Sequence, residues 1–207
     1  MNCSEQFDKV LDVYDKIPMD GSVSLLTGRN GSGKSLVRKL LAIKAKGEHK
    51  KNLVHASMQL RTAMHSGLGG LGGIFRDTEE YSTSSHTAYL VQTACRSIHG
   101  GYLCIDEVEV GLGEETILGI VGWLNANLRQ ALQGTLGCLV VTHSRLVVQG
   151  LDFDHWFSLD GHVTPKEWLE RELVPTDLGV LQEENIKFYR YVIEQSQDRK
   201  SRSGRGK

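Results

Sequence analysis

The sequence lacks long apolar runs, paired cysteines and net charge. No stretch approaches the ~18 consecutive apolar residues that cross a bilayer, and the polar start at residues 1–5 has no signal-peptide core. A formal net charge of -1 gives no overall attraction to nucleic acid or to an anionic membrane, so any such binding would have to be local. The four cysteines form no C-x-x-C pair, which favours buried free thiols in a reducing compartment. We therefore expect a cytoplasmic protein without membrane contact.

The length and composition favour one globular domain. The 207 residues are 40% hydrophobic and 24% charged, which is typical of a soluble protein with its own core. We predict a single domain over residues 1–196, with an N-terminal helix within 1–20 and an amphipathic helix over 176–196. Basic residues among serine and glycine predict a disordered tail at 197–207, which leaves a local contact with nucleic acid open.

A glycine-rich segment provides the strongest motif. Residues 28–35 read Gly-Arg-Asn-Gly-Ser-Gly-Lys-Ser, which fits the phosphate-binding pattern G-x-x-x-x-G-K-[ST]. A strand-like run at 22–27 precedes it and a helical pattern at 35–43 follows, so the helix N-terminus would face a bound anion. Lys34 would reach the β- and γ-phosphates, and Ser35 would ligate Mg²⁺. The predicted nucleotide-binding residues in this loop are Gly28, Arg29, Asn30, Gly31, Ser32, Gly33, Lys34 and Ser35.

Two further strand-like runs end in polar residues. The run 102–105 is followed by Asp106 and Glu107, which is typical of a Walker B motif. Asp106 would hold the Mg²⁺ shell, and Glu107 would polarise a water for attack on the γ-phosphate. His143 stands at the end of the run 138–142, where a ligand binds in an open α/β sheet. These runs predict an α/β P-loop NTPase fold with a mainly parallel central sheet and helices on both faces.

The spacing of apolar residues predicts the remaining elements. Helical periodicity favours helices at 4–17 (with Ser4 as N-cap), 87–98, 116–132 and 166–173. A further strand is predicted at 52–58, and Trp156–Val163 predicts a β-hairpin turned by Asp160 and Gly161.

The order of these motifs resembles that of ABC-type ATPase domains. The version resembled is that of the SMC, RecF and overcoming-lysogenization-defect type, not that of a transporter. Residues 28–35 are similar to its G-x-N-G-S-G-K-S Walker A motif, and residues 106–112 resemble its D-E-P-E-x-G-L segment with Val108 in place of proline. Residues 141–144 are similar to its switch-histidine segment. The resemblance covers about residues 22–163.

This resemblance implies a function. It implies ATP as ligand with Mg²⁺, Glu107 as catalytic base or water-positioner, and His143 as a sensor of the γ-phosphate. Gln59 matches the glutamine-loop position in order along the chain. Two protomers would sandwich two ATP molecules head to tail and drive a protein partner in DNA maintenance, a mobile element or defence.

Several features depart from that family. The sequence has no Leu-Ser-Gly-Gly-Gln signature, and the nearest segment by position is Ser-Thr-Ser-Ser-His-Thr at 82–87. A predicted helix replaces the antiparallel β-subdomain that normally precedes the Walker A motif. Only 71 residues (positions 35 to 105) separate Lys34 from Asp106, which leaves no room for coiled-coil arms.

Two other functions stay open. A P-loop kinase would transfer the γ-phosphoryl group to a small molecule, with Arg61, Arg76 and Arg96 available for its lid. The Asp106–Glu107 pair and the Thr-His strand end favour water as the acceptor instead. A non-hydrolysing switch would bind ATP and signal by assembly, whereas a glutamate at position 107 favours hydrolysis.

Overall fold

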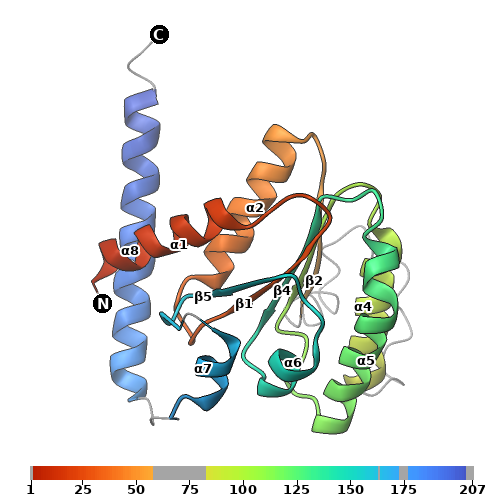
Figure 1. Ribbon diagram of the computed structural model, residues 1–207. Helices are drawn as coiled ribbons and strands as arrows, with labels where there is room; N and C mark the ends of the chain where they lie inside the picture. Colours follow the sequence, from red (N-terminus) through yellow and green to blue (C-terminus); the bar gives the residue numbers. More distant parts are fainter. Residues whose placement is uncertain (1, 58–82, 163, 173–176, 204–207) are drawn as a thin grey trace.

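A five-stranded parallel sheet lies at the centre of the fold, with helices packed around it (Figure 1). The computed structural model describes residues 2–57, 83–162, 164–172 and 177–203. The strands, in chain order, are β1 (Val23–Thr27), β2 (Leu53–Ser57), β3 (Tyr102–Asp106), β4 (Gly137–Thr142) and β5 (His155–Ser158). Their order across the sheet is β2-β3-β4-β1-β5. The predicted α/β fold with a parallel central sheet is confirmed.

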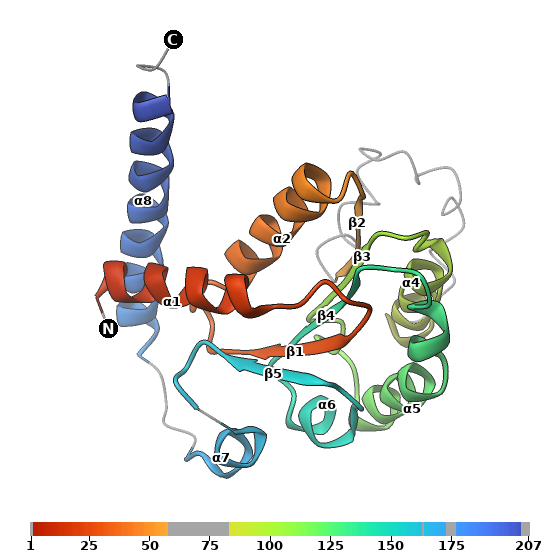
Figure 2. The ribbon, with the colours of Figure 1, turned by 45° about the horizontal axis from the view of Figure 1, so that its top comes forward.

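Helices cover both faces of the sheet, as predicted (Figures 1 and 2). One face carries α1 (Cys3–Lys16) and α2 (Lys34–Glu48), and the other carries α4 (Thr83–Ser97), α5 (Glu114–Ala131) and α6 (Arg145–Gly150). The chain ends with α7 (Pro165–Glu170) and α8 (Leu178–Ser203), and α8 crosses α1 and projects beyond it. Among the helices that the structure describes, none combines the length and the apolar character needed to cross a bilayer.

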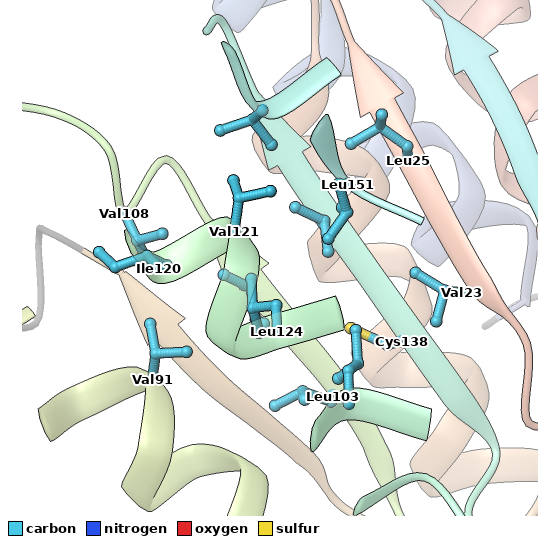
Figure 3. Close-up of a cluster of buried hydrophobic side chains, with 14 of the residues drawn as sticks. Val23, Leu25, Val91, Leu103, Val108, Ile120, Val121, Leu124, Cys138 and Leu151 are labelled. Atoms are coloured by element: carbon cyan, nitrogen blue, oxygen red, sulfur yellow. The ribbon is translucent and has the colours of Figure 1, made fainter. Parts of the chain in front are cut away.

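The core consists of two hydrophobic layers, one on each face. Successive strand residues point to opposite faces, so Leu25 and Val140 join the layer under α5 with Leu124 (Figure 3). Leu26 belongs to the other layer and packs with Val37 of α2. Burial on both faces explains why β1, β3 and β4 are apolar along most of their length instead of alternating with polar residues.

The N-cap of α1 is Asn2, not Ser4. The Asn2 side chain accepts a hydrogen bond from the Glu5 backbone N–H at 2.8 Å, and the Glu5 carboxylate accepts one from the Asn2 N–H at 3.1 Å. This capping box needs a glutamate three residues after the cap, and only Asn2 has Glu5 at that distance. The predicted helix was therefore correct in kind, but its N-cap was placed two residues too late.

The predicted hairpin at 156–163 is wrong. β5 pairs in parallel with β1, and no partner strand follows it within the described residues up to His162. Asp160 and Gly161 do form a turn, but the Asp160 carboxylate accepts a hydrogen bond from the Arg29 backbone N–H at 2.7 Å. Turn-forming residues fix a reversal of the chain, not the strand pairing beyond it, and here they anchor the glycine-rich loop.

The final helix is longer than its sequence pattern predicts. α8 continues to Ser203, past residue 196, where we expected a disordered tail to begin. No proline or glycine interrupts the chain between residues 180 and 203, and basic residues are favourable near a helix C-terminus. Residues 204–207 lie outside the described part of the chain.

The buried core layers predict a clear difference between two leucine substitutions. Leu139 in β4 is 0% exposed, whereas Leu118 on α5 is 52% exposed. We expect Leu139→Ala to lower the free energy of unfolding by about 2–5 kcal/mol, because it leaves a cavity under α1 and α2. The matched change Leu118→Ala should cost less than about 0.5 kcal/mol. Urea denaturation of both variants measures this, and equal losses would contradict the described packing.

Candidate functional site

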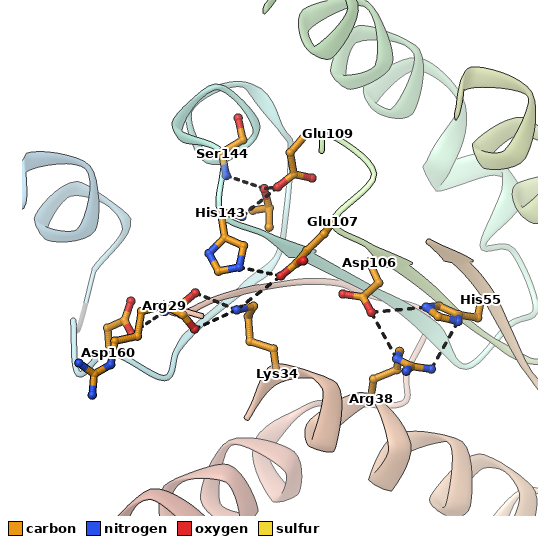
Figure 4. A network of polar contacts seen from close by, with 12 residues as sticks. Arg29, Lys34, Arg38, His55, Asp106, Glu107, Glu109, His143, Ser144 and Asp160 are labelled. Carbon is orange, nitrogen blue, oxygen red and sulfur yellow. Dashed lines mark hydrogen bonds and ion pairs between the residues drawn. The ribbon is translucent and has the colours of Figure 1, made fainter. Parts of the chain in front are cut away.

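The predicted site residues converge at the carboxyl edge of the sheet (Figure 4). Because all strands are parallel, the loops after β1, β3 and β4 leave from the same edge. β4 lies between β1 and β3, so His143 emerges between the glycine-rich loop and Glu107. Lys34 Nζ lies 3.5 Å from Glu107 Oε1, and His143 Nε2 lies 2.6 Å from the same oxygen. The structure therefore brings together the three predicted catalytic residues.

The glycine-rich loop wraps around the Lys34 side chain. Lys34 Nζ donates hydrogen bonds to the carbonyl oxygens of Gly28, at 2.9 Å, and of Arg29, at 3.1 Å. Gly31 and Gly33 have φ angles of 76° and 104°, a region that glycine adopts at little cost, and Gly33 is the N-cap of α2. The backbone is thus folded as a phosphate-binding loop at a helix N-terminus.

Electrostatics keep Glu107 ionised. The interaction with His143 and then the charge of Lys34 lower the pKa of Glu107, against the opposing effect of partial burial. Burial lowers the pKa of Lys34, whose side chain is only 6% exposed, and the nearby Glu107 carboxylate opposes that shift. A carboxylate held between two nitrogen atoms at the rim of a phosphate loop can orient or deprotonate a water molecule.

The backbone at Glu107 directs its side chain into the site. The Glu107 N–H donates to the Val141 carbonyl at 2.9 Å, which extends the β3–β4 pairing by one step. Its φ of 51° lies in the left-handed region, which is uncommon for a residue other than glycine. The chain therefore turns sharply at this residue, and such conformations are frequent at functional sites.

Glu109 holds the end of β4 in place. Its Oε1 accepts hydrogen bonds from the Thr142 hydroxyl and, at 2.9 Å, from the His143 backbone N–H. The Thr142 hydroxyl oxygen in turn accepts one from the Ser144 N–H at 2.9 Å. Glu109 lies inside the predicted motif at residues 106–112, but no role was predicted for it from the sequence. Its carboxylate at the second position after Glu107 was the available clue.

Asp106 lies in a separate polar cluster beside the loop. Its Oδ2 is 3.3 Å from Arg38 Nε and 3.5 Å from His55 Nε2, and the three side chains are mostly buried. Arg38 NH1 also lies 3.4 Å from His55 Nδ1. Neither Arg38 nor His55 was predicted from the sequence as a partner of Asp106. Arg38 stands four residues after Lys34 on α2, which is a usable clue, whereas the position of His55 depends on the pairing of β2 with β3.

The donor set fits Mg²⁺ bound together with a phosphate. Mg²⁺ in phosphate-binding sites takes one or two protein oxygens and completes its shell with phosphate oxygens and water. The Ser35 hydroxyl at the start of α2 and the Asp106 carboxylate at the end of β3 provide such oxygens. Within the described residues, no cluster of three or more His, Cys, Asp or Glu could hold a metal without a substrate.

A cavity of about 450 Å³ lies over the loop, a volume in the range of small-ligand pockets. Its walls include Glu107 and part of α8. The predicted nucleotide-binding residues that line it are Asn30, Gly31, Gly33, Lys34 and Ser35. Gly28, Arg29 and Ser32 are not among the lining residues but contribute to the shape of the loop. The Arg29 backbone N–H donates a hydrogen bond to the Asp160 carboxylate, and a Cβ on Gly28 would lie 2.5 Å from the Ser32 hydroxyl oxygen.

Two other predicted segments are placed only in part. Gln59 lies outside the described residues, as does Ser82. Residues 83–87 form the first turn of α4, where Thr116 of α5 donates a hydrogen bond to the Ser84 hydroxyl oxygen at 3.3 Å. α4 packs against β2 and α5 on the face opposite α2, so this segment belongs to the other side of the sheet.

Comparisons with known proteins add only distant structural likeness. No protein-family model and no curated protein matches the chain. Among solved structures, it is similar to a nucleotide-free ATP-binding cassette from an ABC transporter, at 15% identity and a TM-score of 0.43, over 67% of this chain and 76% of that one. It is also similar to PCH-2 of C. elegans, at 14% identity and a TM-score of 0.36, over 76% of this chain and 40% of that one. Likeness at this level says nothing about activity, substrate or partner.

The lowered pKa of Glu107 predicts a pH-dependent contribution to stability. A carboxyl group whose pKa is lower in the folded chain than its ordinary value of 4.5 stabilises the fold above that value. The contribution is lost as pH falls through the folded pKa. We therefore expect the stability advantage of the wild type over Glu107→Gln to shrink as pH falls from about 6 to about 3.

Denaturant titrations at several pH values measure this difference. Glu194→Gln, at an exposed position of α8, controls for the general loss of one carboxylate. A wild-type advantage that does not change with pH would show that Glu107 is not held by His143 and Lys34.

Proposed function

We propose that this protein is a Mg²⁺-dependent ATPase. One observation carries the proposal: Glu107 Oε1 lies 3.5 Å from Lys34 Nζ and 2.6 Å from His143 Nε2. Lys34 belongs to the glycine-rich loop, Glu107 follows Asp106 at the end of β3, and His143 follows β4, the strand between β1 and β3. This arrangement suits transfer of the γ-phosphoryl group to water.

The chain's own residues would act in sequence. The loop N–H groups and Lys34 bind the β- and γ-phosphates, and the Glu107 carboxylate orients a water molecule in line with the γ-phosphorus. The water oxygen forms the new P–O bond, its proton passes to Glu107, and the bond to the bridging oxygen breaks to release ADP. Mg²⁺ held by Ser35 and Asp106 would neutralise charge that develops on the phosphates. His143 would contact the γ-phosphate and transmit its presence to the end of β4, which Glu109 holds.

The motif order supports a more specific assignment to the SMC, RecF and overcoming-lysogenization-defect type. In that arrangement, two protomers form a head-to-tail dimer around two ATP molecules, and residues 82–87 of one protomer contact the γ-phosphate held by the other. The hydroxyl groups at the start of α4 suit such a contact. The dimer would drive a protein partner in the cytoplasm, in DNA maintenance, a mobile element or defence. Light scattering in Mg²⁺-ATP should then give twice the monomer mass for Glu107→Gln.

A kinase is the weaker alternative. Its lid would use Arg61 and Arg76, which lie outside the described residues, and Arg96, which is exposed in the last turn of α4. A glutamate beside the phosphate loop supports water as the acceptor. The same glutamate also argues against a non-hydrolysing switch, because such a switch would not need a residue that activates water.

Two substitutions separate binding from hydrolysis. Glu107→Gln keeps the shape of the side chain but removes the base, so we expect the hydrolysis rate to fall about 10²–10⁴-fold while ATP affinity changes by less than about threefold. Lys34→Ala removes the buried positive charge that would contact the phosphates, so we expect ATP affinity to fall by at least about tenfold. Phosphate release and equilibrium titration with ATP measure the two effects, with Glu194→Gln as the control. Hydrolysis that survives in Glu107→Gln would contradict the assigned role.

A further inference from the structure

Helix α8 forms a second wall of the cavity above the glycine-rich loop. The cavity is lined on this side by Asn185, Phe188, Tyr189 and Val192. Phe188 and Tyr189 come three and four residues after Asn185, and Val192 comes four and three residues after them, so the four positions share one face of the helix. A single face of α8 is therefore turned toward the loop, although the two segments lie about 150 residues apart in the sequence.

The position of α8 is fixed by specific contacts. Phe188 is only 8% exposed and belongs to the same core layer as Val10 of α1. A Cβ added to Gly31 would lie 1.6 Å from Asn185 Oδ1, so the loop and the helix approach closely only because residue 31 is glycine. Arg29 NH2 also lies 3.8 Å from Glu184 Oε2. The helix is thus a built part of the cavity.

The side chains that line the cavity change along its length, from polar near the loop to aromatic and apolar further along α8. Near the loop it is lined by Lys34, Ser35 and Asn185, which are polar. Helices α2 and α8 both lead away from the loop (Figure 1). One turn further along them, Tyr189 and Val192 line the cavity with an aromatic and an apolar surface, beside the ammonium group of Lys39. A ligand with a charged phosphate tail and a flat apolar head fits this order. A nucleoside triphosphate has that shape.

Tyr189 is suited to contact the flat head of such a ligand. Its side chain is 65% exposed even though it lines the cavity, so much of the ring surface is accessible. The ring stands on a regular helix that is anchored by Phe188 at the preceding position. An aromatic ring offers a nucleobase a stacking surface with little conformational entropy to lose.

We propose that Tyr189 stacks on the nucleobase of the bound nucleotide, which makes α8 part of the nucleotide site. This inference rests on the proposed function, because the phosphates must occupy the loop for the base to reach α8. Stacking uses the face of the base and not its hydrogen-bonding edge, so this contact strengthens binding of adenine and guanine nucleotides alike.

Calorimetric titration with ATP and with inorganic tripolyphosphate tests the proposal. Tripolyphosphate carries the charges of the nucleotide without its base. We expect Tyr189→Ala to weaken ATP binding by about tenfold or more and to leave tripolyphosphate binding within about twofold of wild type. Tyr189→Phe should retain ATP affinity because it keeps the ring. Ile186→Ala is the matched control, since Ile186 is 45% exposed on the same helix and does not line the cavity.

Each other outcome overturns the proposal in a distinguishable way. Unchanged ATP affinity in Tyr189→Ala would exclude stacking while leaving the ATPase proposal intact. Equal weakening of ATP and tripolyphosphate would show that Tyr189 shapes the loop and does not contact the base. Wild-type protein that binds neither ligand would refute the proposed function itself, and the stacking contact with it. Equal thermal unfolding midpoints for the variants confirm that each is folded.

Discussion

The buried ammonium group of Lys34 is the constraint on which the site depends. Only 6% of this side chain is exposed, and a charge removed from water must be compensated by nearby polar groups. Two loop carbonyls and the Glu107 carboxylate provide that compensation, so the loop must curl around the lysine and Glu107 must point back toward it. The same arrangement places the ammonium group of Lys34 inside the curl of the loop, at the N-terminus of α2.

The order of strands converts this local requirement into a complete site. With β4 inserted between the loop strand and the Glu107 strand, the residue after β4 is placed beside Glu107 without any special loop. Glu109 then fixes that residue by accepting hydrogen bonds from Thr142 and from the His143 backbone. On the other flank, Arg38 and His55 hold Asp106. These contacts tie the ends of β3 and β4 to each other and to the glycine-rich loop, which holds Lys34, Glu107 and His143 together.

Much of the fold could be predicted from the sequence, because strands buried on both faces are apolar along most of their length and the apolar residues of helices recur every three to four residues. The glycine-rich loop and the polar strand ends could also be predicted, because their motif residues occur at fixed positions directly after these apolar strands. The predictions that failed, and the site residues that were not predicted, depend on contacts between segments far apart in the sequence. Asp160 and Gly161 indicated a turn but not that β5 would pair with β1. His55, Glu109 and Asn185 acquire their roles only from neighbours that the sequence does not specify. The short helix α6 offered too few residues for a periodic pattern.

In the proposed reaction, Glu107 and its neighbours direct water, and no other acceptor, at the γ-phosphate. The most direct measurement is turnover of Mg²⁺-ATP by wild-type protein in ¹⁸O-enriched water, followed by mass analysis of the products. We expect the released inorganic phosphate to contain an oxygen atom from the solvent, and no phosphorylated small molecule to be required. ATP that is bound but never cleaved, or a γ-phosphoryl group that appears on another acceptor without solvent oxygen, would contradict it.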